Sequence, residues 1–120
     1  MAIRLQLCTS ATLEPGVRAA MEGVFVRAFQ VDGDARQCLE PYFQKVESVL
    51  LAWDRSDLLG FQFYQSVAVD GETVHHFSLA GRLPDLRARG LQGKFGRFLI
   101  QRCIWRTLPW RPVWIAGVSN

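Results

Sequence analysis

The chain has 120 residues, of which 49% are hydrophobic and 21% are charged, and its net charge is +3. This length and composition predict a single folded domain over residues 1–120 and exclude an intrinsically disordered chain. The longest uncharged apolar run, residues 48–53, is too short to cross a membrane, and residues 1–6 lack the apolar run of a signal peptide. We therefore expect a cytoplasmic protein with no membrane partner.

The beginning of the chain predicts one strand followed by one helix. Residues 3–8 alternate apolar and polar side chains, as a half-buried strand does. Apolar residues at helical spacing predict a helix over about 14–30. Hydroxyl side chains just before it offer caps, namely Thr9, Ser10 and Thr12.

A second helix and a second strand follow. Residues 31–34 have the composition of a turn, and Asp34 can cap a helix over 35–46. Pro41 should kink or split that helix, because proline cannot donate a backbone hydrogen bond. The continuous apolar run at 48–53 is typical of a central strand.

The second half of the chain predicts two more strands, a helix and a last strand. Residues 59–69 and 73–82 are the two strands, and Asp70–Gly71 between them is a strong hairpin signal. Apolar residues at helical spacing predict a helix over 90–107, and residues 113–118 form the last strand. These elements together predict an α+β domain.

The chain contains cysteines at three scattered positions, Cys8, Cys38 and Cys103. Their odd number and wide spacing fit neither a disulfide framework nor a zinc site. We expect buried, reduced thiols and no metal.

Positive charge is concentrated in the C-terminal part of the chain. Residues 82–111 hold eight basic side chains and one acid, Asp85, whereas residues 1–81 are acidic on balance. Such a block indicates an anionic partner, for example a phosphate group or nucleic acid. A solvated helix face is the alternative interpretation.

The segment 83–94, between a predicted strand and a predicted helix, has the chemistry of a pyrophosphate site. Gly90 and Gly93 let backbone N–H groups approach a ligand, because glycine has no Cβ. The first-turn amides of a helix have no partner within it, and the helix dipole adds positive potential there. Glycine also serves purely structural turns between a strand and a helix. The dinucleotide-binding and P-loop patterns are both absent.

The pattern formed by Pro84, Arg87, Gly90 and Gly93 resembles the acetyl-CoA motif of the GCN5-related N-acetyltransferases (GNAT). That motif reads Arg/Gln-x-x-Gly-x-Gly/Ala, and Gln92 stands where the family has Gly or Ala. The order of elements is similar over essentially the whole chain. The resemblance implies a mixed sheet of about five strands with helices on both faces. It also implies acetyl-CoA as cosubstrate and an N-acyltransferase acting on an amine that the sequence does not identify, or a CoA-binding remnant of such an enzyme.

The resemblance further implies which residues hold the coenzyme. Backbone amides of the loop would bind its pyrophosphate, at Arg87, Arg89, Gly90, Leu91, Gln92 and Gly93. The preceding strand would pair with the pantetheine arm near Arg82, where the family has a small apolar residue. We therefore expect the side chain of Arg82 to point away from the thioester channel.

Acetyl transfer to an amine needs a base, because the amine must be neutral to attack the thioester. Some family members carry a glutamate six residues before the position of Arg82, and His76 stands there in this chain. Ser78 shares the strand parity of His76 and could order a water, so these two are the predicted catalytic residues. His75 should point to the opposite face of the strand. Alternatively, both histidines are polar residues on a half-exposed strand.

The sequence departs from the family pattern after the fifth strand. Members usually continue with another helix, which often carries a tyrosine general acid, and with two more strands, but this sequence ends at Asn120. Neither Tyr42 nor Tyr64 matches that tyrosine. We expect a C-terminally short domain whose last strand is an apolar edge, which favours a homodimer.

A different class of function is also compatible with the sequence. A non-catalytic α+β protein could bind nucleic acid or a protein partner through the basic segment 82–111. Charge that lines a coenzyme cleft should cluster at residues 87–94. A nucleic-acid surface should instead spread the charge through Arg97, Arg102, Arg106 and Arg111.

Overall fold

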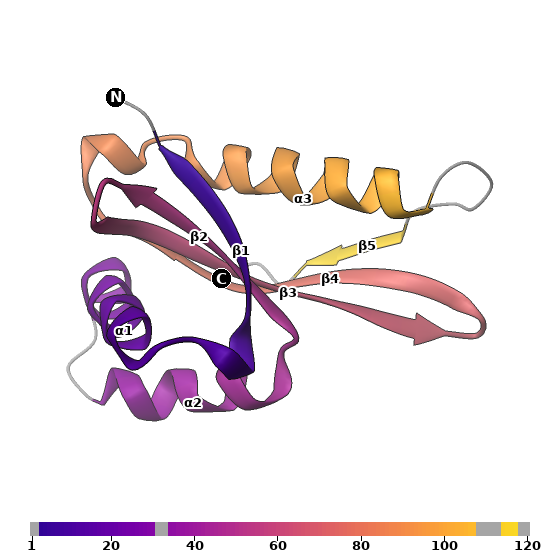
Figure 1. The fold of residues 1–120 in the computed structure, drawn as a ribbon, viewed down its shortest axis with the longest axis horizontal. Coiled ribbons are helices and arrows are strands. Elements are labelled where there is room, and N and C mark those ends of the chain that lie inside the picture. Colours follow the sequence, from indigo (N-terminus) through magenta and orange to yellow (C-terminus); the bar gives the residue numbers. More distant parts are fainter. Residues whose placement is uncertain (1–2, 31–33, 108–113, 118–120) are drawn as a thin grey trace.

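The computed structural model describes residues 3–30, 34–107 and 114–117. The elements in these ranges are β1 (Arg4–Thr9), η1 (Ser10–Thr12), α1 (Pro15–Phe29), α2 (Ala35–Lys45), β2 (Ser48–Asp54), β3 (Asp57–Val69), β4 (Glu72–Arg82), η2 (Leu86–Ala88), α3 (Leu91–Thr107) and β5 (Trp114–Gly117) (Figure 1). The predicted order of strands and helices is confirmed.

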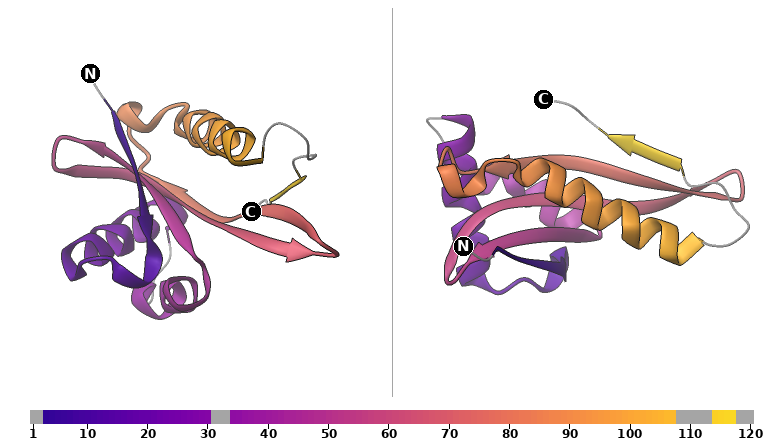
Figure 2. Two further views of the ribbon diagram at one scale, coloured as in Figure 1. Left: turned by 45° about the vertical axis from the view of Figure 1, so that its right-hand side comes forward. Right: turned by 90° about the horizontal axis from the view of Figure 1, so that it is seen from above.

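The strands form one sheet in the order β1-β2-β3-β4-β5. The first four pair antiparallel, and β5 runs parallel to β4. Helices α1 and α2 cover one face of the sheet and α3 covers the other (Figures 1 and 2). The mixed sheet with helices on both faces is therefore confirmed. The predicted strand at 48–53 is β2, which lies inside the sheet between β1 and β3 and whose residues 49–52 are fully buried, so its interior position is confirmed.

Helix α1 begins later than its predicted caps. Its N-cap is Glu14, whose side chain makes no capping hydrogen bond, and Pro15 occupies the first turn. The hydroxyl residues before it form the short turn η1 instead, where the Thr12 hydroxyl donates to the carbonyl of Thr9 at 3.3 Å. The predicted caps are wrong because the chain turns once before the helix starts.

Helix α2 is capped by Asp34, as the sequence predicts. The Asp34 carboxylate accepts from the backbone N–H groups of Arg36 at 3.1 Å and Gln37 at 3.4 Å. The helix runs through Pro41 without being split. Its last turns pack on β3, where the Phe63 ring centroid lies 5.2 Å from that of Tyr42 and 5.8 Å from that of Phe43.

The β3–β4 hairpin turns at Asp70 and Gly71, which have φ values of 51° and 79°. Positive φ at both central residues is the geometry of the tight turn that the sequence predicts. Further along the hairpin, the register shifts between Gln62 and Tyr64, so β4 carries a bulge. The buried Gln62 amide stabilises the bulge, since it donates to the carbonyls of Phe63 at 3.0 Å and Ser78 at 2.9 Å.

Gly60 of β3 allows the start of α3 to pack on the sheet. A Cβ at Gly60 would lie 2.5 Å from Cδ2 of Leu91 and 2.8 Å from the carbonyl oxygen of Gly81. Leu91 is the first residue of α3, and its side chain is fully buried. Because Gly60 has no side chain, the first turn of α3 can approach the sheet closely at this point.

The cysteines differ from their prediction. Cys8 is half-buried, and burial raises the pKa of its thiol, but Cys38 is exposed on α2. The side chain of Cys103 lies outside the described residues. Within the described part of the chain, no helix has the length and apolar character that a membrane span requires.

Candidate functional site

Strand β4 separates from β5 halfway along its length. Their pairing runs from Val74 opposite Trp114 to Phe77 opposite Gly117. Residues 78–82 have no strand partner on that side among the described residues. One backbone edge of β4 is therefore open over this stretch, and such an edge can pair with an extended ligand.

A short loop links the open end of β4 to α3, and its first amides bond within the loop. The Asp85 side chain accepts from the N–H of Arg87 at 2.9 Å, and the N–H of Arg89 donates to the carbonyl of Leu86 at 3.2 Å. The expectation that these two amides face a pyrophosphate is therefore wrong. The 3-10 turn η2 uses both of them to close itself.

The next amides are available for a ligand. The N–H of Lys94 makes the first helical bond, to the carbonyl of Gly90 at 3.3 Å. In the described part of the chain, the N–H groups of residues 90–93 have no hydrogen-bond acceptor. Gly90 has a φ of 74°, which turns the chain into the 17-residue helix α3. Adjacent N–H groups at the start of a long helix form a site for an anion.

Arg87 stabilises this loop through its side chain. Its guanidinium contacts the carboxylates of Asp54 at 2.9 Å, Asp57 at 3.1 Å and Asp85 at 3.0 Å. Asp54 and Asp57 flank the β2–β3 turn, so Arg87 ties the loop to that hairpin. Hydrogen bonds to Arg87 lower the pKa of Asp85, and these carboxylates raise the pKa of Arg87. The positive charge of Arg87 is thus already balanced, whereas Arg89 and Lys94 are exposed.

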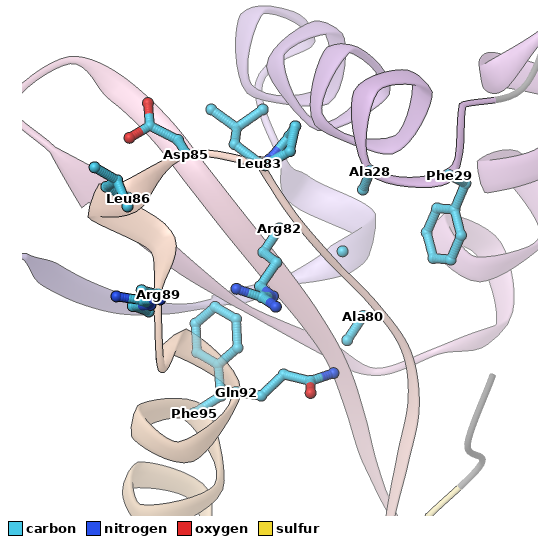
Figure 3. Close-up of a pocket in the computed structure, with 12 residues that line it drawn as sticks. Ala28, Phe29, Ala80, Arg82, Leu83, Asp85, Leu86, Arg89, Gln92 and Phe95 are labelled. Carbon is cyan, nitrogen blue, oxygen red and sulfur yellow. The ribbon is translucent and has the colours of Figure 1, made fainter.

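A cavity of about 450 Å³ follows the open edge of β4 and is called here the α3–β4 groove. It is lined by Ala28, Phe29, Ala80, Gly81, Arg82, Leu83, Pro84, Asp85, Leu86, Arg89, Gln92 and Phe95. Figure 3 shows Arg82 of β4 beside Gln92 and Phe95 of α3. Arg82 lines the groove, and its guanidinium donates to the Ala88 carbonyl at 3.4 Å, on the side of the loop before α3; its orientation relative to the thioester stays a prediction.

A second cavity, of about 370 Å³, lies between α2 and β4 and is called here the α2–β4 pocket. It is lined by Pro41, Tyr42, Lys45, Val46, Gln65, His76, Ser78 and Leu79. The structure thus brings together the two residues predicted from the strand, His76 and Ser78. Sequence reasoning missed Tyr42, Lys45 and Gln65. The spacing of Tyr42 and Lys45 places them on one helix face, but spacing does not show which strand that face meets.

His75 points away from this pocket, as predicted. It is 2% exposed, which excludes the interpretation of both histidines as half-exposed polar residues. Its ring stacks on Tyr64, and the Tyr64 hydroxyl and His75 Nδ1 share a hydrogen bond of 2.6 Å.

The groove and the pocket are lined by successive residues of β4. Residues 76, 78 and 79 line the pocket, and residues 80–83 line the groove. The stretch of strand from Arg82 back to Ser78 spans about 13 Å. A ligand held at the amides of residues 90–93 and extended along this edge would place its far end beside His76 and Ser78.

The basic residues of α3 do not decide between the two expected charge distributions. Arg97 and Arg102 are exposed. The side chain of Arg106 and all of Arg111 lie outside the described residues. The spread of charge that a nucleic-acid surface requires stays a prediction.

No protein-family model matches the chain, and no curated protein sequence does. Solved structures do match. An aminoglycoside acetyltransferase from an uncultured soil metagenomic sample has a TM-score of 0.73 at 13% identity, covering 100% of this chain and 81% of that one. A ribosomal-protein-alanine N-acetyltransferase from Brucella melitensis biovar Abortus 2308 has a TM-score of 0.65 at 16% identity, covering 98% and 82%.

A third match carries the coenzyme. It is a GNAT family acetyltransferase from Brucella melitensis in complex with acetyl-CoA, with a TM-score of 0.56 at 17% identity, covering 82% of this chain and 68% of that one. These likenesses show that the chain has the GNAT fold. The resemblance found in the sequence is therefore confirmed at the level of the fold.

Proposed function

We propose that the chain is an acyl-CoA-dependent N-acyltransferase that binds acetyl-CoA along β4 and acetylates an amine in the α2–β4 pocket. The amine nitrogen forms a bond to the acetyl carbonyl carbon, the thioester C–S bond breaks, and CoA leaves as its thiol. The observation that carries this proposal is the open edge of β4 between residues 78 and 82. It connects an anion site at one end to a pocket with a candidate base at the other.

The start of α3 suits the pyrophosphate of the coenzyme. The amides of residues 90–93 can each donate to a phosphate oxygen, and the dipole of α3 favours negative charge there. Arg89 and Lys94 are exposed beside these amides and add two positive charges. The open edge of β4 would hold the pantetheine arm, and Arg82 lines the groove beside it. When bound, acetyl-CoA supplies the acetyl group as an activated thioester.

His76 is the proposed general base. It lines the α2–β4 pocket, at the level where β4 leaves β5. A neutral imidazole can accept the proton that the amine loses as its N–C bond forms. Ser78 lines the same pocket, and its buried hydroxyl, which makes no hydrogen bond within the described part of the chain, is the group we assign to hold the amine or a water that relays the proton.

The solved structures support an amine acceptor without identifying it. One match is named for aminoglycosides and another for the alanine of a ribosomal protein, which are very different amines. The acceptor therefore has to be inferred from the pocket of this chain.

Two glycines of α3 provide a matched test of coenzyme binding. A Cβ at Gly93 or at Gly96 would meet nothing within 4 Å, and valine has a somewhat higher helix propensity than glycine, so we expect α3 to tolerate valine at either position. Gly93 belongs to the amide site and Gly96 lies one turn further along. We expect Gly93→Val to weaken acetyl-CoA binding by about tenfold or more in calorimetry, through obstruction of the phosphates, with Gly96→Val close to the unmodified chain.

A thermal-shift measurement gives a second readout of the same proposal. A ligand at 100 times its Kd should stabilise the fold by about 2.7 kcal/mol. Turnover is followed by release of the CoA thiol with a panel of amines. No binding of acetyl-CoA by the unmodified chain, or equal affinities of the two glycine variants, would overturn the proposed function.

A further inference from the structure

The α2–β4 pocket has a charge pattern that restricts its ligand. Among the described residues that line it, Lys45 is the one side chain with a full charge, and none is an acid. An acceptor with two amines would bring a second ammonium group into this pocket. The pocket has no carboxylate to pair with that group, and the ammonium of Lys45 would repel it. Like charges at close range disfavour binding, whereas an opposite charge favours it.

The charge of Lys45 is not already used by the protein. In the described part of the chain, its ammonium makes no ion pair or hydrogen bond. The carboxylate of Glu40, on the same helix, instead accepts from the side-chain amide of Gln44 at 3.2 Å. Lys45 is exposed at the end of α2, so it can reach a ligand in the pocket without first breaking a contact.

Two rows of side chains face each other across the pocket. Tyr42 and Lys45 are three residues apart on α2 and therefore share a helix face. His76 and Ser78 line the opposite wall from β4, and the Ser78 hydroxyl is buried with no partner among the described residues. The pocket thus has a base on the wall formed by β4, and a cation and a phenol on the wall formed by α2.

We infer that the acceptor is an amine that also carries a carboxylate, such as an amino acid or a short peptide with a free C-terminus. Lys45 pairs with the carboxylate while the amine lies at His76. This inference rests on the proposed function, because it takes the α2–β4 pocket to be the acceptor site. It adds the class of acceptor and gives Lys45 the role of a specificity-determining residue.

The test compares a carboxylate with its uncharged isostere. N-acetyl-leucine and N-acetyl-leucinamide mimic the products of acetyl transfer. The first has a carboxylate where the second has an uncharged amide. Neither has a free amine, so no difference in amine pKa affects the comparison. Their affinities are measured by calorimetry on the full chain in the presence of CoA. We expect the unmodified chain to bind the acid roughly 3- to 10-fold more tightly than the amide.

Variants of Lys45 identify the source of that preference. Lys45→Gln should remove the preference, and Lys45→Glu should reverse it. The control is Arg36→Gln, which removes a positive charge from an exposed position of the same helix outside this pocket and should keep the preference. Steady-state kinetics with leucine and leucinamide as acceptors then test the same preference during turnover. We expect the Lys45 substitutions to raise the KM for leucine and to leave kcat unchanged.

Failure of the inference differs from failure of the proposed function. Equal affinity for acid and amide, or a preference that Lys45→Glu leaves unchanged, overturns the acceptor class even if acetyl transfer to other amines is observed. A Lys45-dependent preference without any acetyl transfer would support the carboxylate site and count against the enzyme.

Discussion

Replacing Gly60 by alanine adds a single methyl group to β3, and we expect it to lower stability and to disturb the coenzyme site. In Gly60→Ala, the added Cβ would lie 2.5 Å from Leu91 Cδ2 and 2.8 Å from the Gly81 carbonyl oxygen. The Leu91 side chain is fully buried, so it cannot rotate into solvent, and the carbonyl belongs to the β3–β4 ladder. The start of α3 must therefore move away from the sheet.

The magnitude follows from two opposing effects. Overpacking of this kind costs about 1–3 kcal/mol. Replacing a strand glycine by alanine recovers about 0.5–1 kcal/mol, because the unfolded chain loses conformational freedom. We expect a net loss of about 0.5–2 kcal/mol, which lowers Tm by roughly 2–8 °C in a chain of this length.

Gly23 is the matched control for this substitution. It lies within α1, and a Cβ there meets nothing within 4 Å. Gly23→Ala should therefore raise the free energy of unfolding by about 0.5–1 kcal/mol. Stability is measured by chemical denaturation of both variants.

The second readout is the affinity for acetyl-CoA, measured where both variants are folded. Gly60→Ala should weaken binding, because displacement of Leu91 also displaces its backbone amide, and Gly23→Ala should not. A Gly60→Ala chain as stable as the unmodified one, with unchanged affinity, would refute this account of how α3 is positioned.

Three further predictions concern chemistry, acid stability and assembly. His76→Ala should lower turnover by about 10²–10⁴-fold in a steady-state assay and leave acetyl-CoA affinity unchanged; His75 is no control for it, since its removal disrupts a buried contact. Because Arg87 lowers the pKa of Asp85, the stabilisation from this pair is present at neutral pH and is lost as pH falls below the ordinary aspartate range. Arg87→Gln should therefore reduce the difference in the free energy of unfolding between neutral and acid pH, measured by chemical denaturation at each pH. As β5 is an edge strand, light scattering should give about twice the monomer mass, and a monomer at high concentration would contradict the predicted homodimer.

Local patterns in the sequence were sufficient for the order of the elements and for several of their turns and caps. The hairpin at Asp70–Gly71, the Asp34 cap and the turn at Gly90 before α3 each involve neighbours within a few residues, so they can be predicted from spacing alone. The same holds for the opposite orientation of His75 and His76, which follows from the alternation of a strand.

Contacts between distant segments were decided only by the tertiary structure. Arg87 matched a phosphate-binding motif, yet carboxylates about thirty residues earlier in the sequence bind its side chain. Lys45 lies on α2 and His76 on β4, and only the packing of that helix on the sheet makes them walls of one pocket. Spacing specifies which residues share a face of one element, but the energy of packing decides which two faces meet, and that energy depends on the whole core.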